Sequence, residues 1–478
     1  MRLVVLSFFI WGSLARSPSV TSVKSTRANT GTFWHLSDLH LDFYYNSAAA
    51  DPSEVCPSSY GRKVENAGPY GNYRCDAPWK LINSTVYAMK EINSNPDFIL
   101  WTGDDTLHTN DQDKYLSPQL VVEAIKNITD LLNEVFPDTA ILSSLGNHDY
   151  HPKSQLPIGP SWLLNETADL WAPWFTDQSA LDTFRENGFY RMSVTAHSDL
   201  NIISLNTPLL YTSNKAFNAS AVEDPGGQFK WLEESLQNIR DLKQTAYLIG
   251  HVPPGYYELV DYKHWYYLQY NEKYINVIKK YSDVISGQFF AHQHSDTFRL
   301  FYSDSGAPLS VMWLAPGVTP WMTTLQGVNN GSNNPGIRLF EFDTVTFTPT
   351  DYEVYYLDLY KANSDNMATW KLEYRATEDY KISDISPTSM DKFMKAVASA
   401  DPGCESCESN IMLQKLSLYN SVSYNTAHCD KTCQTNQVCA ITEVSESGHD
   451  KCLRGAADKV KQTIAMMVVI FLCFFISS

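Results

Sequence analysis

Basic side chains are scarce in this sequence. The 478 residues include 36 Lys and Arg against 53 Asp and Glu, which gives a formal net charge of -17. A protein that binds duplex nucleic acid needs a basic face, so this composition argues against that class of function. A local site can still attract small anions, because a bound metal ion outweighs the net charge of the chain.

Cysteine and charge are low as well. Nine cysteines are too few for a small scaffold held together by disulfides, and 19% charged with 44% hydrophobic residues does not fit a disordered chain. We therefore expect one large domain or two ordinary ones, each with its own core.

An apolar run stands at each end of the chain, and neither is long enough to cross a bilayer comfortably. Residues 3–14 follow Met1 and Arg2 and precede the small residue Ala15. This pattern predicts a secretory signal over residues 1–15, and an N-terminal membrane anchor is the alternative.

The C-terminal run covers residues 464–476 and follows a small triplet at 455–457 and a polar spacer at 458–463. At ~1.5 Å per residue it is about 20 Å long, short of the roughly 30 Å hydrocarbon core. The layout predicts a cleaved glycolipid (GPI) anchor signal over residues 456–478. A short tail anchor or a packed C-terminal helix is the alternative. We expect an extracellular, cell-surface protein, or a secreted or endolysosomal one.

Passage through the secretory pathway favours glycosylation and disulfides. Asn-x-Ser/Thr sequons occur at Asn83, Asn127, Asn165, Asn218 and Asn330. Because Cys473 lies in the C-terminal run, eight cysteines remain to pair. We expect Cys56 to bond Cys75. The others, between Cys404 and Cys452, mark a C-terminal subdomain, with a zinc ribbon as the alternative.

The middle of the chain alternates strand-like apolar runs with helical patterns. A Ser117-Pro118 start and apolar residues at helical spacing predict an amphipathic helix. Alternation of this kind indicates α/β layers. Expected strands cover 32–36, 98–101, 139–145, 201–205, 245–249, 288–291, 310–314 and 337–342. Residues 31–375 would form the main domain and 376–455 a Cys-rich subdomain, with helices at 390–400 and 410–419.

Short polar motifs follow several of these strands. In an α/β sheet, ligands bind at the carboxyl ends of strands. A single histidine there is more often structural, but an ordered set of such motifs is hard to obtain by chance. The motifs are Ser37-Asp-Leu-His40, Thr102-Gly-Asp-Asp105, Gly146-Asn-His-Asp149, Gly250-His-Val252 and Ala291-His-Gln-His294.

These motifs offer two carboxylates, one amide and four histidines besides His148. Such donors suit zinc, iron or manganese, and they are too many for one zinc ion but suit two ions that share a carboxylate. Two metals about 3.5–4 Å apart form a clamp for in-line attack on a phosphoryl centre by an activated water. His148 is next to Asn147 and points elsewhere, which leaves it free for acid catalysis.

The motif set resembles the calcineurin-like metallophosphoesterase superfamily, with Ala291 where a glycine is usual. The resemblance implies a four-layer β-sandwich flanked by helices. Within the superfamily the chain is similar to the acid sphingomyelinase-like phosphodiesterases over residues 31–453. His108 lies four residues after Asp104, as in that branch, and residues 146–152 are close to its motif sequence. Cys429 with Cys433 and Cys439 with Cys452 match its C-terminal disulfides, which implies a small disulfide-bonded helical subdomain.

The resemblance also sets limits. Purple acid phosphatases have a tyrosine ligand where this chain has Leu107, so we expect no ferric charge-transfer site. Acid sphingomyelinase itself carries a saposin domain before its catalytic domain, and few residues precede Asp38 here. We therefore do not expect unaided attack on sphingomyelin in a membrane.

The resemblance implies a role for each site residue. Asp104 would bridge two zinc ions, the first also held by Asp38, His40 and His294 and the second by Asn147, His251 and His292. His148 and His108 would contact the phosphate, with His148 favoured as the acid that protonates the leaving alkoxide. We also expect Asp105 and Asp149 to orient the ligand histidines.

The branch cleaves phosphodiester or pyrophosphate bonds in nucleotide derivatives and phosphocholine conjugates. Aromatic residues between Pro253 and Tyr270 could line the pocket and stack a base or enclose a choline, or could simply pack beneath a loop. A phosphomonoesterase, or a catalytically weak metal-binding surface protein that acts through a partner, remains an alternative. We expect a monomer, attached to the membrane through its glycolipid anchor.

Overall fold

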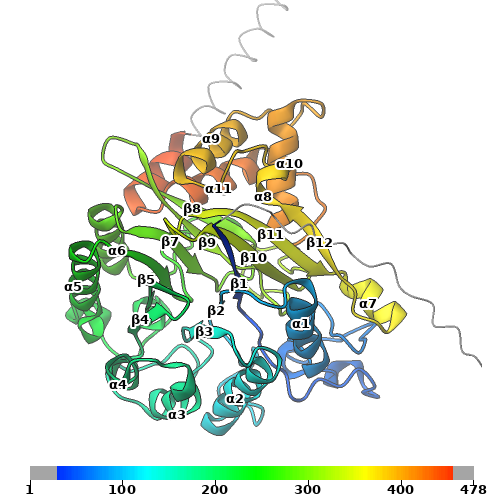
Figure 1. Cartoon of the computed structure of the whole chain (residues 1–478). Coiled ribbons are helices and arrows are strands. Elements are labelled where there is room, and N and C mark those ends of the chain that lie inside the picture. Colours follow the sequence, from blue (N-terminus) through cyan, green and yellow to red (C-terminus); the bar gives the residue numbers. More distant parts are fainter. Residues whose placement is uncertain (1–28, 456–478) are drawn as a thin grey trace, which may run out of the picture.

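The computed structural model describes residues 29–455, in which two mixed sheets pack face to face between layers of helices (Figure 1). The first sheet has the order β12 (Trp370–Arg375), β11 (Pro349–Leu357), β10 (Gly336–Asp343), β1 (Thr30–Leu36), β2 (Phe98–Trp101), β3 (Ala140–Ser143). The second has the order β4 (Tyr190–Val194), β5 (His197–Ser204), β6 (Thr245–Ile249), β7 (Ile285–Phe290), β9 (Pro308–Leu314), β8 (Thr297–Tyr302). This confirms the predicted α/β sandwich flanked by helices.

Aromatic side chains fill the space between the sheets. Phe33 on β1 stacks on Phe98 and on Phe340 of its own sheet and meets Phe289 on β7 edge to face, 5.1 Å between ring centroids. All four are fully buried. Such pairs add to the hydrophobic contribution of ring burial, so this cluster fixes how the two sheets face each other.

The helices lie on the outer faces of the sandwich (Figure 1). Ser117 caps α2 by accepting the Leu120 N–H, with Pro118 in the first turn, as the sequence predicted. The helices are α1 (Trp79–Ile92), α2 (Pro118–Val135), α3 (Trp162–Trp171), α4 (Gln178–Asn187), α5 (Gln228–Asp241), α6 (Leu268–Tyr281), α7 (Leu359–Asp365), α8 (Ala376–Asp379), α9 (Pro387–Ala398), α10 (Glu408–Asn420) and α11 (Lys431–Thr442).

Each strand predicted from the sequence is present, β2 and β6 with the predicted ends and the others with shifted ends, but β4, β8, β11 and β12 were missed. Three of these, β4, β8 and β12, are sheet edges. On β12 the charged side chains of Lys371, Glu373 and Arg375 hide the apolar pattern of a strand.

The C-terminal helices are tied to the sandwich and to one another. Helices α9 and α11 pack against β8, and α9 also packs against β9. Cys429–Cys433 and Cys439–Cys452 are bonded, as is Cys404–Cys407, so the zinc-ribbon alternative is wrong. The predicted Cys56–Cys75 bond is also present. The boundary at residue 375 stays a prediction.

The predictions for both chain ends, the signal at 1–15 and the anchor signal at 456–478, fall outside the described residues. Between residues 29 and 455 the structure contains no helix that is both long and apolar enough to cross a membrane.

A buried ion pair joins β8 to the loop between β6 and α6, and the end of α10 bonds to the same carboxylate. Arg299 Nη2 lies 2.8 Å from Glu258 Oε2, and both side chains are fully buried. Asn420 Nδ2 donates to the other oxygen of Glu258 at 2.7 Å, and Arg299 Nη2 also donates to Gln293 Oε1 at 2.9 Å. The C-terminal helices are thereby linked to the loop that follows β7.

We predict that Arg299→Met destabilises the protein strongly, because it leaves the Glu258 carboxylate buried without its partner. Urea denaturation should show a loss of about 3–5 kcal/mol in the free energy of unfolding. Lys361→Ala, which removes the exposed pair with Asp365, is the control and should leave the midpoint unchanged. A small effect of Arg299→Met would mean that the pair contributes little.

Candidate metal centre

The candidate ligands lie where the carboxyl ends of parallel strands meet. Strands β1, β2 and β3 run parallel to one another, and β6 runs parallel to β7. Asp38 and His40 follow β1, Asp104 follows β2, Asn147 follows β3, His251 follows β6, and His292 and His294 follow β7. Their placement is the one that the motif positions predicted.

Asp104 lies at the centre of this cluster. Its Oδ2 is 3.0 Å from His251 Nε2 and 3.6 Å from His40 Nε2. Donor atoms of Asp104, His251 and His292 lie within 4.8 Å of one another, and so do those of Asp38, His40 and Asp104. Asp104 therefore takes part in two groups of donors, as a bridging ligand must.

His294 forms a third group of donors with His40 and His108, and Asn147 lines the same cavity. His294 Nε2 is 3.6 Å from Asp38 Oδ1 and 3.2 Å from His40 Nε2. The Asn147 amide nitrogen donates to Ser154 Oγ at 3.3 Å. Its oxygen has no hydrogen-bond partner among the described residues. The amide is thus turned so that its oxygen is available as a ligand.

Most of these ligands have a left-handed backbone, which is unfavourable for residues with side chains. Neighbouring loops hold this conformation: Asp38 N–H donates to Gly103 O, and Gly317 N–H donates to His294 O, each at 3.0 Å. Strain of this kind concentrates at functional sites. The φ angles are 50° at Asp38, 42° at His40, 61° at Asp104, 76° at His292 and 58° at His294.

Two of the histidines are fixed in one tautomer. His40 Nδ1 donates to Thr106 O and His251 Nδ1 donates to Thr102 O, each at 2.7 Å. A carbonyl oxygen can only accept, so Nδ1 carries a proton and Nε2 is the ring nitrogen that faces the cluster. This is the arrangement that a metal-binding imidazole needs.

The prediction that Asp105 and Asp149 orient the ligand histidines is wrong. Asp149 accepts the backbone N–H groups of Asp104, Asp105 and Gly146 at 2.7–2.9 Å. Asp105 accepts Trp101 Nε1–H at 3.0 Å. Asp149 therefore shapes the two loops that carry Asp104 and Asn147. Its carboxylate oxygens are taken up by backbone N–H groups rather than by an imidazole.

The charges at the centre are not balanced by the protein alone. Burial raises the pKa of Asp38 to about 7, and the neighbouring Asp104 carboxylate adds to the shift. Burial also opposes the charge on Asp104, but His251 and His148 hold its pKa well below the usual value. Two carboxylates this close do not both stay ionised without a cation.

The donor set fits a divalent cation. Atoms without a hydrogen-bond partner among residues 29–455 include Asp38 Oδ1, Asn147 Oδ1 and both ring nitrogens of His292. Buried polar atoms are normally paired, and a neutral imidazole has one acceptor nitrogen, so the unpaired oxygens of Asp38 and Asn147 and one nitrogen of His292 are acceptors that fit a cation. Mixed imidazole and carboxylate donors are typical of zinc, iron and manganese sites.

His108 and His148 lie beside the donors. Their ring centroids are 4.4 Å apart, and His148 N–H donates to Asp104 Oδ1 at 2.7 Å. Burial lowers the pKa of both imidazoles well below the ordinary value. Both rings line a cavity of about 600 Å³ that also reaches His292 and His294.

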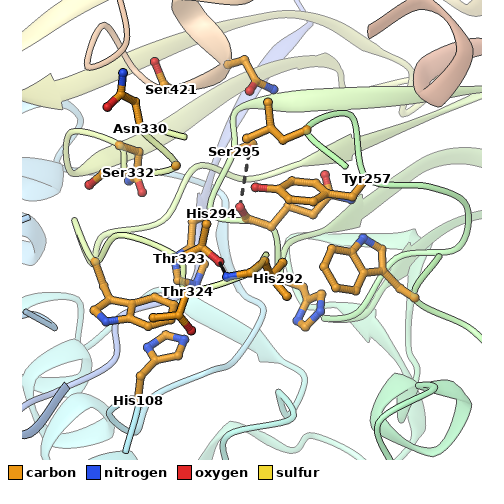
Figure 2. Close-up of a pocket in the computed structure, with 18 of the residues that line it drawn as sticks. His108, Tyr257, His292, His294, Ser295, Thr323, Thr324, Asn330, Ser332 and Ser421 are labelled. Carbon is orange, nitrogen blue, oxygen red and sulfur yellow. Dashed lines mark hydrogen bonds between the residues drawn. The ribbon is translucent and has the colours of Figure 1, made fainter. Parts of the chain in front are cut away.

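The cavity extends from the donors towards the C-terminal helices. Figure 2 shows His108, His292 and His294 near one another, and Ser421, which follows α10, at the far end. Tyr257 and Trp265 line the wall, as the aromatic segment predicted. Tyr266 from the same segment is instead fully buried and bonds Val252 O.

Sequence reasoning missed other residues of the cavity. Lys153, Tyr211, Trp321 and Asn420 all line it. Lys153 follows the Gly146–Pro152 motif directly and could have been found from that position. The other three come from loops and helix ends far apart in the sequence, and no local pattern marks them.

The fold and the donor set define the class. Residues 31–296 match the calcineurin-like phosphoesterase family. The chain is a metallophosphoesterase, a class that works with a divalent metal centre.

The family within that class is also clear. Residues 307–459 match the acid sphingomyelin phosphodiesterase C-terminal region. The chain is 44% identical to the human acid sphingomyelinase-like phosphodiesterase 3b, over 94% of this chain and 96% of the relative. It is 39% identical to the human cyclic GMP-AMP phosphodiesterase SMPDL3A (89% and 90%). It is 37% identical to sphingomyelinase phosphodiesterase C of Dictyostelium discoideum (88% and 92%). The chain belongs to the acid sphingomyelinase-like phosphodiesterases, a family of phosphoric diester hydrolases.

We predict that Gly146→Ala disturbs the centre, because a Cβ there would lie 2.1 Å from Asp104 Oδ1. The overlap should lower the free energy of unfolding by about 1–3 kcal/mol, measured by thermal denaturation. Gly403→Ala is the matched control, since its Cβ would lie 3.4 Å from Asp401 Oδ1, an ordinary contact distance. Equal stability of the two variants would contradict the close packing at Gly146.

Proposed function

We propose that the chain is a secreted or cell-surface two-zinc phosphodiesterase that hydrolyses phosphodiester or pyrophosphate bonds. The observation that carries the proposal is the pair of donor groups that share Asp104 beside two further histidines. The family match supports the reaction class, and the unpaired buried acceptor atoms support the binding of cations.

In this proposal Asp104 bridges the two zinc sites. When bound, the metal pair supplies positive charge to the phosphate and an activated water. The first site is held by Asp38, His40, Asp104 and His294, and the second by Asp104, Asn147, His251 and His292.

His148 and His108 act on the substrate. Both would contact the phosphate. Burial lowers the pKa of each imidazole in the free protein, and the negative charge of a bound phosphate would raise it again. His148 would donate its proton to the leaving alkoxide, which is a poor leaving group without it. His148 Nδ1 has no hydrogen-bond partner among the described residues.

The substrate would be a nucleotide derivative or a phosphocholine-type diester. The cavity of about 600 Å³ has aromatic side chains on its wall, and Lys153 is the one Lys or Arg among its described lining residues. Aromatic faces bind a base or a choline group, and the names of the relatives include both a cyclic dinucleotide and sphingomyelin. We propose that a soluble diester is preferred to a lipid in a membrane.

Location follows from the ends of the chain. We propose that residues 1–15 direct secretion and that residues 456–478 are exchanged for a glycolipid anchor. The four disulfides support an oxidising compartment. None of the five sequon asparagines is buried, which supports glycosylation.

The main test is an assay of the secreted protein on bis(p-nitrophenyl) phosphate and p-nitrophenyl phosphate, with metal content by mass spectrometry. We expect turnover of the diester, about two zinc ions per chain, and loss of both in Asp104→Ala. A preference for the monoester would favour the phosphomonoesterase. Bound metal without turnover of either ester would favour a surface binding protein.

A second test separates the roles of the two histidines. For His148→Ala we expect kcat to fall about 10²- to 10⁴-fold on a diester with an alkyl leaving group, and much less on the p-nitrophenyl diester, which leaves without a proton. His108→Ala is the comparison, and a purely phosphate-binding role would reduce both rates alike. An equal loss on both substrates in His148→Ala would remove His148 as the acid.

A further inference from the structure

We propose that Asp76 and Trp321 are positioning residues that hold the imidazole of His108 in the cavity. The proposal rests on the proposed function, in which His108 contacts the phosphate. In this proposal the disulfide-bonded segment 56–75 supports His108 through Asp76 and Trp321.

Asp76 binds His108 twice. Its Oδ2 accepts the backbone N–H of His108 at 2.6 Å, and its Oδ1 accepts the ring Nδ1–H at 2.9 Å. Asp76 is fully buried. With Nδ1 engaged, Nε2 is the ring atom left for the substrate. One ring nitrogen of His108 lies within 4.8 Å of ring nitrogens of His40 and His294.

Trp321 fixes the plane of the same ring. Its indole stacks on the imidazole of His108, with 3.7 Å between centroids and an angle of 11° between planes. The ring of His40 lies 4.1 Å away. With the stack setting its plane and Asp76 holding one edge, the imidazole of His108 has a single orientation.

One short segment holds both supports. Asp76 follows Cys75, which is bonded to Cys56, and its N–H donates to Ser58 Oγ at 2.9 Å. Trp321 Nε1–H donates to Ser58 O at 3.0 Å. The same residue of the segment thus contacts both groups that touch His108.

The segment is built as a unit. Val55, Cys56, Val64 and Cys75 form a small buried cluster separate from the two main cores. The segment carries none of the candidate metal ligands, so its effect on the site passes through Asp76 and Ser58. Thr319 adds a third constraint by donating to Asp76 Oδ1 at 3.0 Å.

A double-mutant cycle tests the proposal, using kcat and KM on the diester together with zinc content. We expect Asp76→Ala to lower kcat about 10- to 100-fold with little change in KM, since misplacing a catalytic group costs rate more than binding. Zinc content should stay at the wild-type level. In the His108→Ala background, adding Asp76→Ala should lower kcat less than about twofold further.

Two further variants sharpen the test. Asp76→Asn keeps a side-chain oxygen for the Nδ1–H and should retain much of the rate, and Trp321→Phe should retain more than Trp321→Leu. Asp391→Ala on α9 is the matched control, because Asp391 is also buried and accepts the Tyr302 hydroxyl at 3.0 Å. It should leave kcat unchanged in either background.

Different failures point to different parts of the argument. If Asp76→Ala lowers kcat equally with and without His108, Asp76 acts elsewhere and the proposal is overturned. If the wild-type protein has no diester activity, the proposed function fails. Crystal structures of the wild type and of Asp76→Ala then test by themselves whether Asp76 positions the His108 ring. Release of the His108 ring in Asp76→Ala would support the proposal, and an unmoved ring would overturn it.

Discussion

Two buried carboxylates that share one small space with imidazole lone pairs are the constraint on which this structure depends. Asp38 and Asp104 are both nearly inaccessible to solvent, and among residues 29–455 the basic side chains within 4.0 Å of their oxygens are all histidines. Such a cluster is stable only when a cation neutralises it or when a proton is taken up. The left-handed backbone at Asp38 and Asp104 shows that the surrounding loops enforce this arrangement rather than relax away from it.

The rest of the molecule supports these loops from several sides. Asp149 gathers backbone N–H groups of the loops after β2 and β3. Gln293, between two ligand histidines, is held by Arg299, which in turn pairs with Glu258 and through it with Asn420. The C-terminal helices are therefore part of the site, and they also line the far end of the cavity. This explains why a catalytic domain of this kind carries a disulfide-bonded helical region after its last strands.

Much of the fold could be predicted from local pattern. The central strands β1, β2, β6 and β7 read as apolar runs because both of their faces are covered. The edge strand β12 could not be predicted in this way, because the charged side chains of Lys371 and Glu373 interrupt its apolar residues. The roles of the aromatic residues after His251 could not be predicted either. Tyr257 and Trp265 line the cavity while Tyr266 is packed in the core, and no sequence pattern distinguishes them.

The sequence by itself determined the reaction class and predicted the residues of the candidate centre, because each candidate ligand lies within a few residues of a strand end and carries a recognisable donor. It also determined the Cys56–Cys75 bond, since the other cysteines cluster far along the chain. Only the tertiary structure decided what Asp149 holds and that Asp76, Ser58 and Trp321 converge on His108. The contacts of Ser58 with Asp76 and with Trp321 join residues 18 and 263 positions apart. No local periodicity records such contacts, because they form only when the packed sheets bring separate loops to the same edge.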